Sequence, residues 1–238
     1  MHRAYHNWHS PSLDRQMEIL IFGYAGAPCL VFPTSHGRFY EYEDRGMVAA
    51  LAHQIEQGWL QLICVDGVYH ESWYNYEGDS NARMWRENQY EHYLLTEVIP
   101  LIRQMNPTSY LIATGCSFGA SEAATFAFRH PGVVNRLLCL HGLYDLRRFF
   151  SHYTEAVYFH NPVDFLQNLD DDWSLDRLRE ADIILVTSQH DPSLGSNEQL
   201  SRILWNKGVG NALRVWDGWT HEWPFWHQMI NMYIGGHD

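Results

Sequence analysis

Residues 110–120 read YLIATGCSFGA, an apolar run that ends in a serine between two glycines. Residues 110–115 have the apolar character of a buried strand, and the SFGASEAATFAFRH segment that follows is rich in small residues and reads as a helix. The G-x-S-x-G pentapeptide therefore lies between a strand and a helix, the setting in which this motif carries information. A Cβ at Gly115 or Gly119 would collide with neighbouring backbone in so sharp a turn. We expect the turn to lift the Ser117 hydroxyl above the sheet as a nucleophile.

Strand-like and helix-like segments alternate on both sides of this turn. The first two apolar runs, 17–22 and 29–33, are separated by YAGAP and are expected to form a hairpin or two adjacent strands. Residues 143–182 are expected to be irregular, as an insertion or lid over the sheet. The remaining expected strands are 60–66, 136–142, 183–188 and 213–217, and the expected helices are 44–57, 86–105, 197–207 and 223–234. The alternation predicts one α/β domain over residues 1–238, with a mostly parallel central sheet and helices on both faces.

The charge balance restricts the classes of ligand. The 238 residues carry a formal net charge of −12 and no basic run. This argues against binding to nucleic acid or to an anionic membrane, and it favours a small neutral or cationic substrate. Met1 to Trp8 carries His, Arg and Asn where a signal peptide would be apolar, and the apolar stretch from Ile19 to Phe32 is interrupted by glycines and Pro28. We expect a soluble, cytoplasmic protein.

Cysteine usage bears on disulfides and metals. The four cysteines, Cys29, Cys64, Cys116 and Cys139, each lie in an apolar, strand-like run and not in a CxxC pair. This placement disfavours disulfides and a zinc site, and it predicts buried free thiols.

A nucleophilic serine needs a base, and in α/β-hydrolases the acid and then the histidine follow the serine along the chain. Asp191 is the favoured acid because SQHDP follows the strand 183–188, which places a carboxylate at the carboxyl end of a strand beside the turn. Asp217, after the next strand, is its rival. His221 lies in DGWTHEWPFW, between the last strand and the last helix, from where an imidazole can reach back over the sheet. The expected triad is Ser117, Asp191 and His221.

Two further groups of residues are expected at the site. Backbone N–H groups of Phe118 and of the TSHG loop should stabilise the tetrahedral oxyanion, with His36 as the favoured loop donor and Gly37 as the alternative. Aromatic residues are dense near the predicted site, and flat amphipathic rings suit a ligand cleft. The expected substrate-binding rings are Trp73, Tyr74, Tyr76, Trp85 and Trp223.

Four motifs resemble the esterase family of α/β-hydrolases that includes esterase D-like S-formylglutathione hydrolases, feruloyl esterases and mycolyltransferases. They are GCSFGA at the serine, the opening AYHNWHSPSLDRQMEILIFG, the loop PTSHGRFYEYED, and THEWPFW, which is similar to the family's H-D/E-W-x-x-W signature around its catalytic histidine. The likeness spans nearly the whole chain. It implies an α/β-hydrolase fold, a triad of Ser117, Asp191 and His221, an oxyanion loop around His36, and no metal or cofactor. The usual loop motif of the thiol-ester branch is not evident, which leaves the acyl substrate open.

The sequence thus predicts a serine-dependent carboxylic ester hydrolase that acts through an acyl-enzyme on a small-molecule ester. A thioesterase or an acyltransferase would use the same triad and would differ only in what intercepts the acyl-enzyme. A binding module that keeps the fold without activity is the alternative from another class. Assembly into a homo-oligomer stays open.

Overall fold

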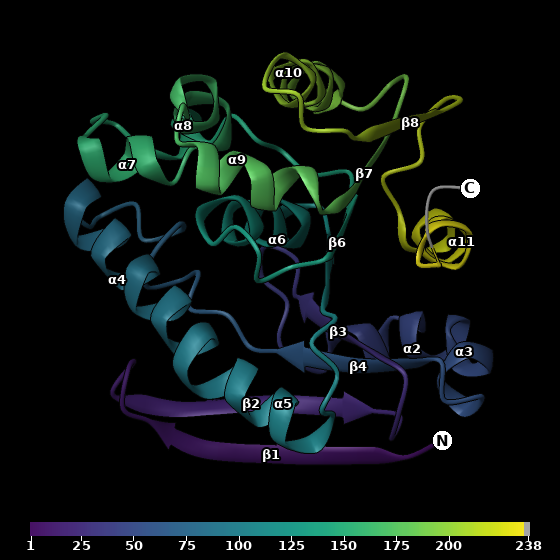
Figure 1. The fold of residues 1–238 in the computed structure, drawn as a ribbon. Coiled ribbons are helices and arrows are strands. Elements are labelled where there is room, and N and C mark those ends of the chain that lie inside the picture. Colours follow the sequence, from purple (N-terminus) through teal and green to yellow (C-terminus); the bar gives the residue numbers. More distant parts are fainter. Residues whose placement is uncertain (236–238) are drawn as a thin grey trace.

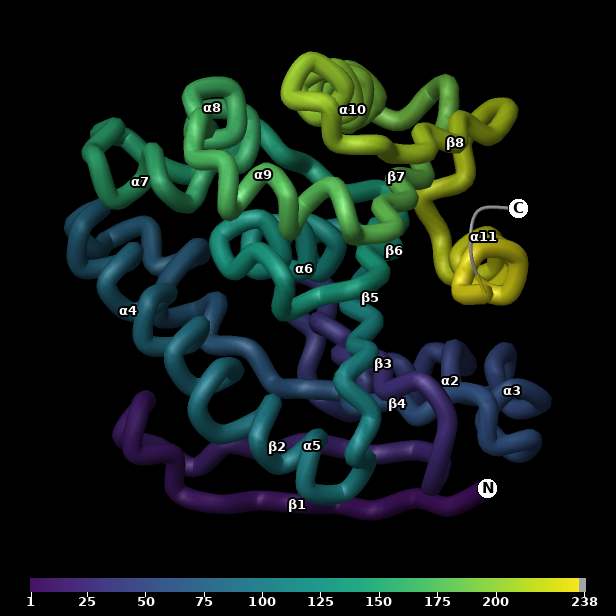
Figure 2. The backbone as a smooth tube through the Cα atoms, in the orientation of Figure 1, coloured from purple at the N-terminus to yellow at the C-terminus, as the bar shows by residue number. Residues whose placement is uncertain are grey.

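The computed structural model describes residues 1–235. This part of the chain contains one eight-stranded sheet, with helices packed against it. The strands are β1 Arg3–Ser10, β2 Arg15–Phe22, β3 Ala27–Phe32, β4 Leu60–Val65, β5 Ile112–Cys116, β6 Arg136–Leu140, β7 Asp182–Ser188 and β8 Ala212–Trp216. They lie in the order β1-β2-β4-β3-β5-β6-β7-β8, so that β1 and β8 are the two edges. In Figure 1 and Figure 2 the purple N-terminal strands lie at one end of the sheet and the yellow-green β8 lies at the other.

The sheet is mixed and not purely parallel. The strands β3 to β8 run parallel to one another, whereas β2 is antiparallel to β4 and β1 is antiparallel to β2. The expectation that 17–22 and 29–33 are neighbours is wrong, because β4 lies between β2 and β3. β2 pairs instead with β1, whose residues RAYHNWHS alternate between exposed and half-buried. The sequence analysis did not predict this strand, because few of its side chains are apolar.

Two of the helices differ from those that the sequence pattern predicts. The expected helix 44–57 is divided into short pieces, with one interruption at Gly46, whose φ is 76°. The expected helix 86–105 begins earlier, at Ser80, where the Asp79 side chain accepts from backbone N–H groups, and it passes through a π-helical turn at Leu94–Val98. The helices are α1 Glu41–Asp44, α2 Met47–Ala50, α3 Ala52–Glu56, α4 Ser80–Tyr93, α5 Ile99–Met105, α6 Phe118–Arg129, α7 Glu155–Phe159, α8 Pro162–Asn168, α9 Asp172–Arg179, α10 Leu194–Asn206 and α11 Trp223–Tyr233.

Successive strand residues point into two different cores. On β4, Leu62 and Cys64 face one core, while Ile63 and Val65 face the other. The helices α4, α5, α6, α8, α9 and α10 pack on the Ile63 side, and α1 to α3 with α11 pack on the Leu62 side. In Figure 1 these two sets of helices lie on opposite sides of the sheet. The structure therefore has the layers that the strand–helix alternation predicts.

The segment 143–182 is more regular than the sequence suggests. It contains a 3₁₀ turn at Arg147–Phe149, here called η2, followed by α7, α8 and α9. These helices have five, seven and eight residues, which is too short for a clear apolar period. α8 packs against α6 and α10, so the segment is a packed layer of the domain. Its role as a lid stays a prediction.

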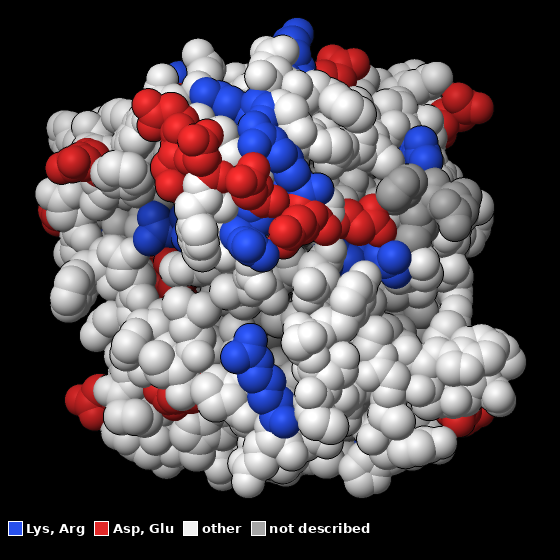
Figure 3. Space-filling view, in the orientation of Figure 1, with Lys and Arg blue, Asp and Glu red and all other residues white. Residues whose placement is uncertain are grey.

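Charged side chains gather in mixed groups on the surface. In Figure 3 acidic and basic side chains lie next to one another over the region of α9, and much of the remaining surface in view is uncharged. On this helix and at its end, Arg177 pairs with Glu180 and Arg179 pairs with Asp176. At α9 positive charge is thus placed beside negative charge.

Two sets of observations concern metals and membranes. The four cysteines are buried and free, as expected. No group of three or more His, Cys, Asp or Glu side chains within residues 1–235 is arranged to hold a metal ion. None of the helices in this same range combines the length and the apolar character that crossing a membrane requires.

Candidate active site

Ser117 occupies the turn between β5 and α6. Its backbone has φ 55° and ψ −122°, a conformation that non-glycine residues rarely adopt and that persists only where the surroundings enforce it. A Cβ built on Gly115 would lie 2.3 Å from the carbonyl carbon of Gly119, and one built on Gly119 would lie 2.4 Å from the carbonyl oxygen of Phe32. Both glycines are therefore required for the turn, which confirms the steric argument made from the sequence.

The side chains of Ser117, His221 and Asp191 form one hydrogen-bonded chain. His221 Nε2 lies 3.0 Å from Ser117 Oγ, and His221 Nδ1 lies 2.5 Å from Asp191 Oδ2. With a carboxylate at Nδ1, the favoured tautomer carries its proton there and leaves Nε2 free to accept from the serine hydroxyl. The residues come from the β5–α6 turn, the loop after β7 and the loop before α11. The structure thus brings together the three residues that the sequence selects.

Asp191 is held by its own turn. Burial alone would raise its pKa, but hydrogen bonds from His221 and from Ser193 outweigh this effect and lower the pKa to about 2. Its Oδ1 accepts the backbone N–H of Ser193 at 2.6 Å. The rival Asp217 is exposed and accepts instead from Gln189 Nε2 at 3.0 Å. The carboxylate beside His221 is therefore that of Asp191, in its ionised form.

Aromatic rings surround His221. The Trp219 ring stacks on the imidazole at 5.8 Å between centroids, and the rings of Trp226 and His141 lie at 5.2 and 5.0 Å. Trp226 Nε1 donates to His141 Nδ1, so the proton of His141 is on Nε2, 3.1 Å from Thr220 Oγ1. Burial lowers the pKa of His141 to about 4, and the nearby His221 adds to this effect. His141 is a neutral, hydrogen-bonded neighbour of the base, a contact for which a sequence with 15 histidines gives no signal.

A cavity of about 300 Å³ lies beside Ser117 and His221. Its wall is mixed, because polar and charged side chains, among them Ser35, Ser121, Arg148 and Ser193, alternate with apolar ones. Its apolar lining comes mainly from Tyr74, Phe118, Leu143, Phe149 and Trp219. Such a cavity suits a small ligand with an apolar body.

Of the rings expected to bind substrate, Tyr74 lines this cavity and the others do not. Trp73 is fully buried and packs edge-on against Phe118, at 5.7 Å between centroids. Trp85 lies on α4 and is exposed, and Trp223 begins α11 and packs against Trp226 at 4.9 Å. The exposed Tyr76 does not line the cavity, and its ring lies 6.2 Å from that of Tyr74. The density of aromatic residues in a sequence does not specify the direction of each ring.

The loop after β3 reaches the cavity through Ser35. Tyr74 donates its hydroxyl proton to Ser35 Oγ at 2.8 Å, and the His36 ring packs on the Tyr74 ring at 5.0 Å. Burial raises the pKa of Tyr74 to about 12, with the Ser35 hydrogen bond opposing this. Gly37 donates its N–H to the Thr34 carbonyl at 3.0 Å, so this amide is engaged within the turn. Of the loop residues considered as oxyanion donors, Gly37 is therefore disfavoured.

The other predicted oxyanion donor is the backbone N–H of Phe118. Phe118 is the first residue of α6, where an N–H group has no partner inside the helix. The N–H groups of Ala120 and Ser121 donate instead to the Ser117 carbonyl. Negative charge that develops beside Ser117 would face the positive end of the helix dipole.

A buried arginine joins two walls of the cavity. Arg83 donates to the carbonyl oxygens of Ser72 and Phe149 at 2.8 and 3.0 Å, and also to that of Trp73. Arg83 is buried, and this desolvation lowers its pKa. Through these bonds the loop that carries Tyr74 is fixed to the η2 turn that carries Phe149.

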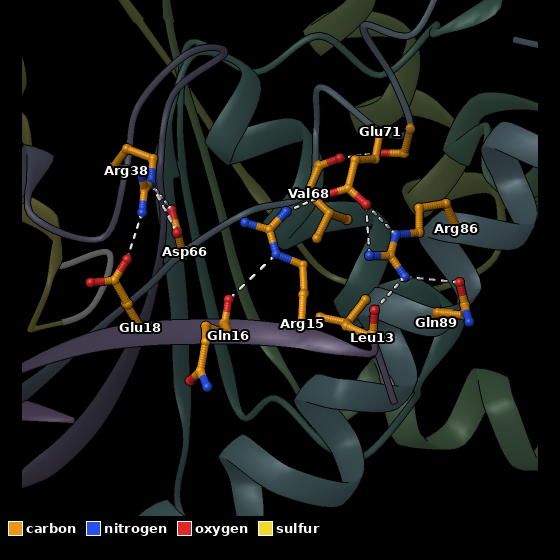
Figure 4. Close-up of polar contacts among 11 residues, drawn as sticks. Leu13, Arg15, Gln16, Glu18, Arg38, Asp66, Val68, Glu71, Arg86 and Gln89 are labelled. Atoms are coloured by element: carbon orange, nitrogen blue, oxygen red, sulfur yellow. Dashed lines mark hydrogen bonds and ion pairs between the residues drawn. The ribbon is translucent and has the colours of Figure 1, made fainter. Parts of the chain in front are cut away.

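A second network, drawn in Figure 4, holds the same loop to the sheet and to α4. Arg38 Nε donates to Asp66 Oδ1 at 2.7 Å, directly after β4. Burial raises the pKa of Asp66, and the Arg38 hydrogen bond acts against this. Glu71 accepts from Arg15 and, at 2.8 Å, from Arg86 of α4. The cavity is thus framed by anchored loops.

Comparison with known proteins gives matches at the level of structure. No family model matches the chain, and no curated protein matches it in sequence. Among solved structures, a ferulic acid esterase superposes with a TM-score of 0.78 at 17% identity, covering 96% of this chain and 95% of that one. An S-formylglutathione hydrolase from Agrobacterium tumefaciens superposes with a TM-score of 0.74 at 13% identity, covering 98% and 93%.

A third similar structure is a fluorophosphonate-binding serine hydrolase from Staphylococcus aureus. It superposes with a TM-score of 0.74 at 16% identity, covering 96% of this chain and 95% of that one. These structures come from the classes of hydrolase that the sequence motifs resemble. Their likeness over nearly the full length of both chains shows that this chain has the α/β-hydrolase fold.

Proposed function

We propose that this chain is a serine-dependent carboxylic ester hydrolase, with Ser117 as nucleophile, His221 as general base and Asp191 orienting the histidine. The observation that carries the proposal is the hydrogen-bonded chain from Asp191 through His221 to Ser117, beside a cavity that can hold a small ester. The structural neighbours support it, because ferulic acid esterases and serine hydrolases share the fold.

In the first half of the proposed cycle, Ser117 Oγ attacks the ester carbonyl carbon while its proton moves to His221 Nε2. The tetrahedral species then expels the alcohol, which takes that proton from His221. In the second half, a water molecule attacks the acyl-enzyme with His221 again as base, and the carboxylic acid leaves. Asp191 stays ionised throughout and stabilises the imidazolium.

The oxyanion of each tetrahedral species is proposed to bind two backbone N–H groups. The first is that of Phe118, at the start of α6. The second comes from the Ser35–His36 part of the TSHG loop, because Ser35 lines the cavity and the Gly37 amide is bonded to Thr34.

The volume of the cavity favours a small substrate. A volume of about 300 Å³ is at the lower end of ligand pockets and suits a short acyl or aryl group. Thioester hydrolysis and acyl transfer would use the same residues.

Hydrolysis of short-chain p-nitrophenyl esters by the purified protein tests the proposal. We expect Ser117→Ala to lower kcat by about 10⁴-fold or more. Ser151→Ala is the matched control, since Ser151 is exposed and lies outside the cavity, and its turnover should stay within about twofold of wild type. Turnover that survives Ser117→Ala would contradict the proposed nucleophile. No turnover, together with no labelling of Ser117 by a fluorophosphonate, would favour the binding-module alternative.

A further inference from the structure

One positive charge on the wall of the cavity has no negative partner. Asp191 and His221 pair with each other, and the remaining charged side chain that lines the cavity is Arg148. Within residues 1–235 its guanidinium makes no ion pair or hydrogen bond with any side chain or carbonyl oxygen, and its contact is with the face of the Phe149 ring, 5.3 Å from the ring centroid. An unpaired cation beside a reactive serine is a feature that the hydrolysis of a neutral ester does not require.

Three other arginines of the chain, by contrast, have partners. Arg147, the preceding residue, forms a two-point ion pair with Asp145, with its Nε 2.8 Å from Asp145 Oδ1. Arg83 is used by backbone carbonyl oxygens, as described above, and Arg129 pairs with Glu91 at 2.7 Å. The chain has 28 acidic residues and only 16 lysines and arginines. Within the described part of the chain, Arg148 therefore lacks a carboxylate partner even though carboxylates outnumber the basic side chains.

The position of Arg148 is fixed by buried groups. It is the central residue of η2, and the carbonyl oxygen of Phe149 accepts from the buried Arg83 at 3.0 Å. The Phe149 ring packs edge-on against Tyr74 at 5.6 Å, so Arg148 lies over the same wall as the tyrosine. Its charge also acts on the Tyr74 pKa, in the lowering direction and against the larger effect of burial. The backbone that carries Arg148 is thus held in place, and its exposed side chain lines the same cavity as Tyr74.

From this arrangement we propose that the substrate is an ester with an apolar or aromatic body and an anionic group, and that Arg148 binds this anion. The inference rests on the proposed ester hydrolysis at Ser117 and names the class of substrate for that site. A guanidinium binds a carboxylate through two parallel N–H donors, which would fix the ester with its carbonyl carbon at Ser117 Oγ. The anion belongs either to the acyl part or to the alcohol part of the ester.

Because the net charge of the protein is −12, Arg148 would also provide local attraction for an anionic substrate. Long-range repulsion slows the approach of an anion to an acidic protein, so an anionic substrate needs a local positive charge at the cavity. The overall charge alone favours neutral or cationic substrates, as argued from the sequence. Arg148 reverses that expectation at the one place where the ester must bind.

The test compares anionic esters with their neutral amide counterparts. For the alcohol side the pair is para-acetoxybenzoate and para-acetoxybenzamide, and for the acyl side it is monoethyl adipate and ethyl adipamate. The readout is the ratio of kcat/KM for the anionic member to that for the neutral member of each pair. Wild type, Arg148→Gln, Arg148→Glu and Arg202→Gln are measured at low and at high salt. Arg202 is exposed on α10 outside the cavity, so its variant removes one charge from the chain without touching the site.

We expect the wild-type ratio to exceed unity by about tenfold in one pair, which identifies the side of the ester that carries the anion. Arg148→Gln should abolish this preference, Arg148→Glu should invert it, and Arg202→Gln should retain it. High salt should reduce it, because Arg148 is exposed. Hydrolysis of the neutral members that depends on Ser117, with no preference in either pair or with a preference unchanged in Arg148→Gln, would overturn the anion site alone. Absence of hydrolysis of all four esters would overturn the proposed function and the anion site with it.

Discussion

His221 Nε2 lies 3.0 Å from Ser117 Oγ, although 104 positions of the sequence separate the two residues. The distance is that of a hydrogen bond in the geometry that a general base needs. It results from two local structures, the β5–α6 turn that projects the serine and the loop between β8 and α11 that returns the histidine over the sheet. Asp191, bonded to the opposite nitrogen of the ring, fixes the direction in which Nε2 points.

Asp191→Asn should remove most of the activity without unfolding the protein. An amide at this position can present its NH₂ group to His221 Nδ1 and so favour the tautomer with its proton on Nε2, which cannot accept from Ser117. We expect kcat for a p-nitrophenyl ester to fall by about 10⁴-fold. Asp217→Asn is the matched control, because this exposed residue bonds Gln189 and should leave kcat within about twofold. Equal losses in the two variants would show that Asp191 is not the orienting acid.

Gly119→Ala should destabilise the fold through the turn itself. The added Cβ would lie 2.4 Å from the Phe32 carbonyl oxygen, so β3 or α6 has to shift. We expect the free energy of unfolding in urea to fall by about 2 kcal/mol or more. Gly195→Ala in α10 provides the comparison, since nothing lies within 4 Å of its added Cβ and alanine favours a helix by up to about 1 kcal/mol. A Gly119→Ala protein as stable as wild type would contradict the steric requirement.

Arg83→Met should loosen the wall of the cavity. The substitution leaves the carbonyl oxygens of Trp73 and Phe149 without the Arg83 donor in a buried place, while that of Ser72 keeps the Asn75 N–H at 3.2 Å. We expect a loss of about 2 to 4 kcal/mol in the free energy of unfolding and an increase in KM for ester substrates. The exposed Arg103 on α5 gives the control variant Arg103→Met, which should change neither quantity appreciably. An unchanged KM in Arg83→Met would show that these bonds do not position the cavity.

The buried His160 should make the folded state sensitive to mild acid. Burial lowers its pKa to about 4 from an ordinary value of 6.5, Arg129 adds to this, and Glu91 acts in the opposite direction. The folded state therefore favours the neutral ring. The stability that it contributes is complete above about pH 6.5 and is lost as the pH falls from there to about 4.

Urea unfolding at a series of pH values measures this contribution. The free energy of unfolding should fall across that window, and the fall should be smaller in His160→Gln by up to about 3 kcal/mol. A part of the fall should remain, because the pKa of His141 is also lowered to about 4 by burial. The same fall in both proteins would contradict the assignment to His160.

Some residues of the site could be predicted because local sterics or their order along the chain determines their place. Gly115, Ser117 and Gly119 follow from the sterics of one turn, which involves few residues and is visible in the sequence. Asp191 and His221 follow from their places after successive parallel strands, because the carboxyl ends of such strands meet at one edge of the sheet. Strand and helix order sufficed for these predictions, without knowledge of any long-range contact.

The remaining features depend on contacts that a sequence does not specify. The insertion of β4 between β2 and β3 is a choice of pairing partner, and the apolar runs of β2 and β3 fit either arrangement. Trp73 lies behind the cavity wall and Arg148 lies on that wall. Both positions depend on how η2 packs, and the irregular composition of 143–182 does not indicate this packing. The sequence therefore indicated the three residues that the structure brings together, but not most of the side chains that line the cavity beside them.

The most direct test of Ser117 as the nucleophile is to trap the acyl-enzyme. The protein is mixed with excess p-nitrophenyl acetate, quenched in acid within the first turnover, digested and examined by mass spectrometry. We predict a burst of p-nitrophenol close to one equivalent and an acetyl group on the peptide that contains Ser117, with both signals lost in Ser117→Ala. Acetylation confined to another residue, or steady turnover without any covalent adduct, would contradict a Ser117 acyl-enzyme.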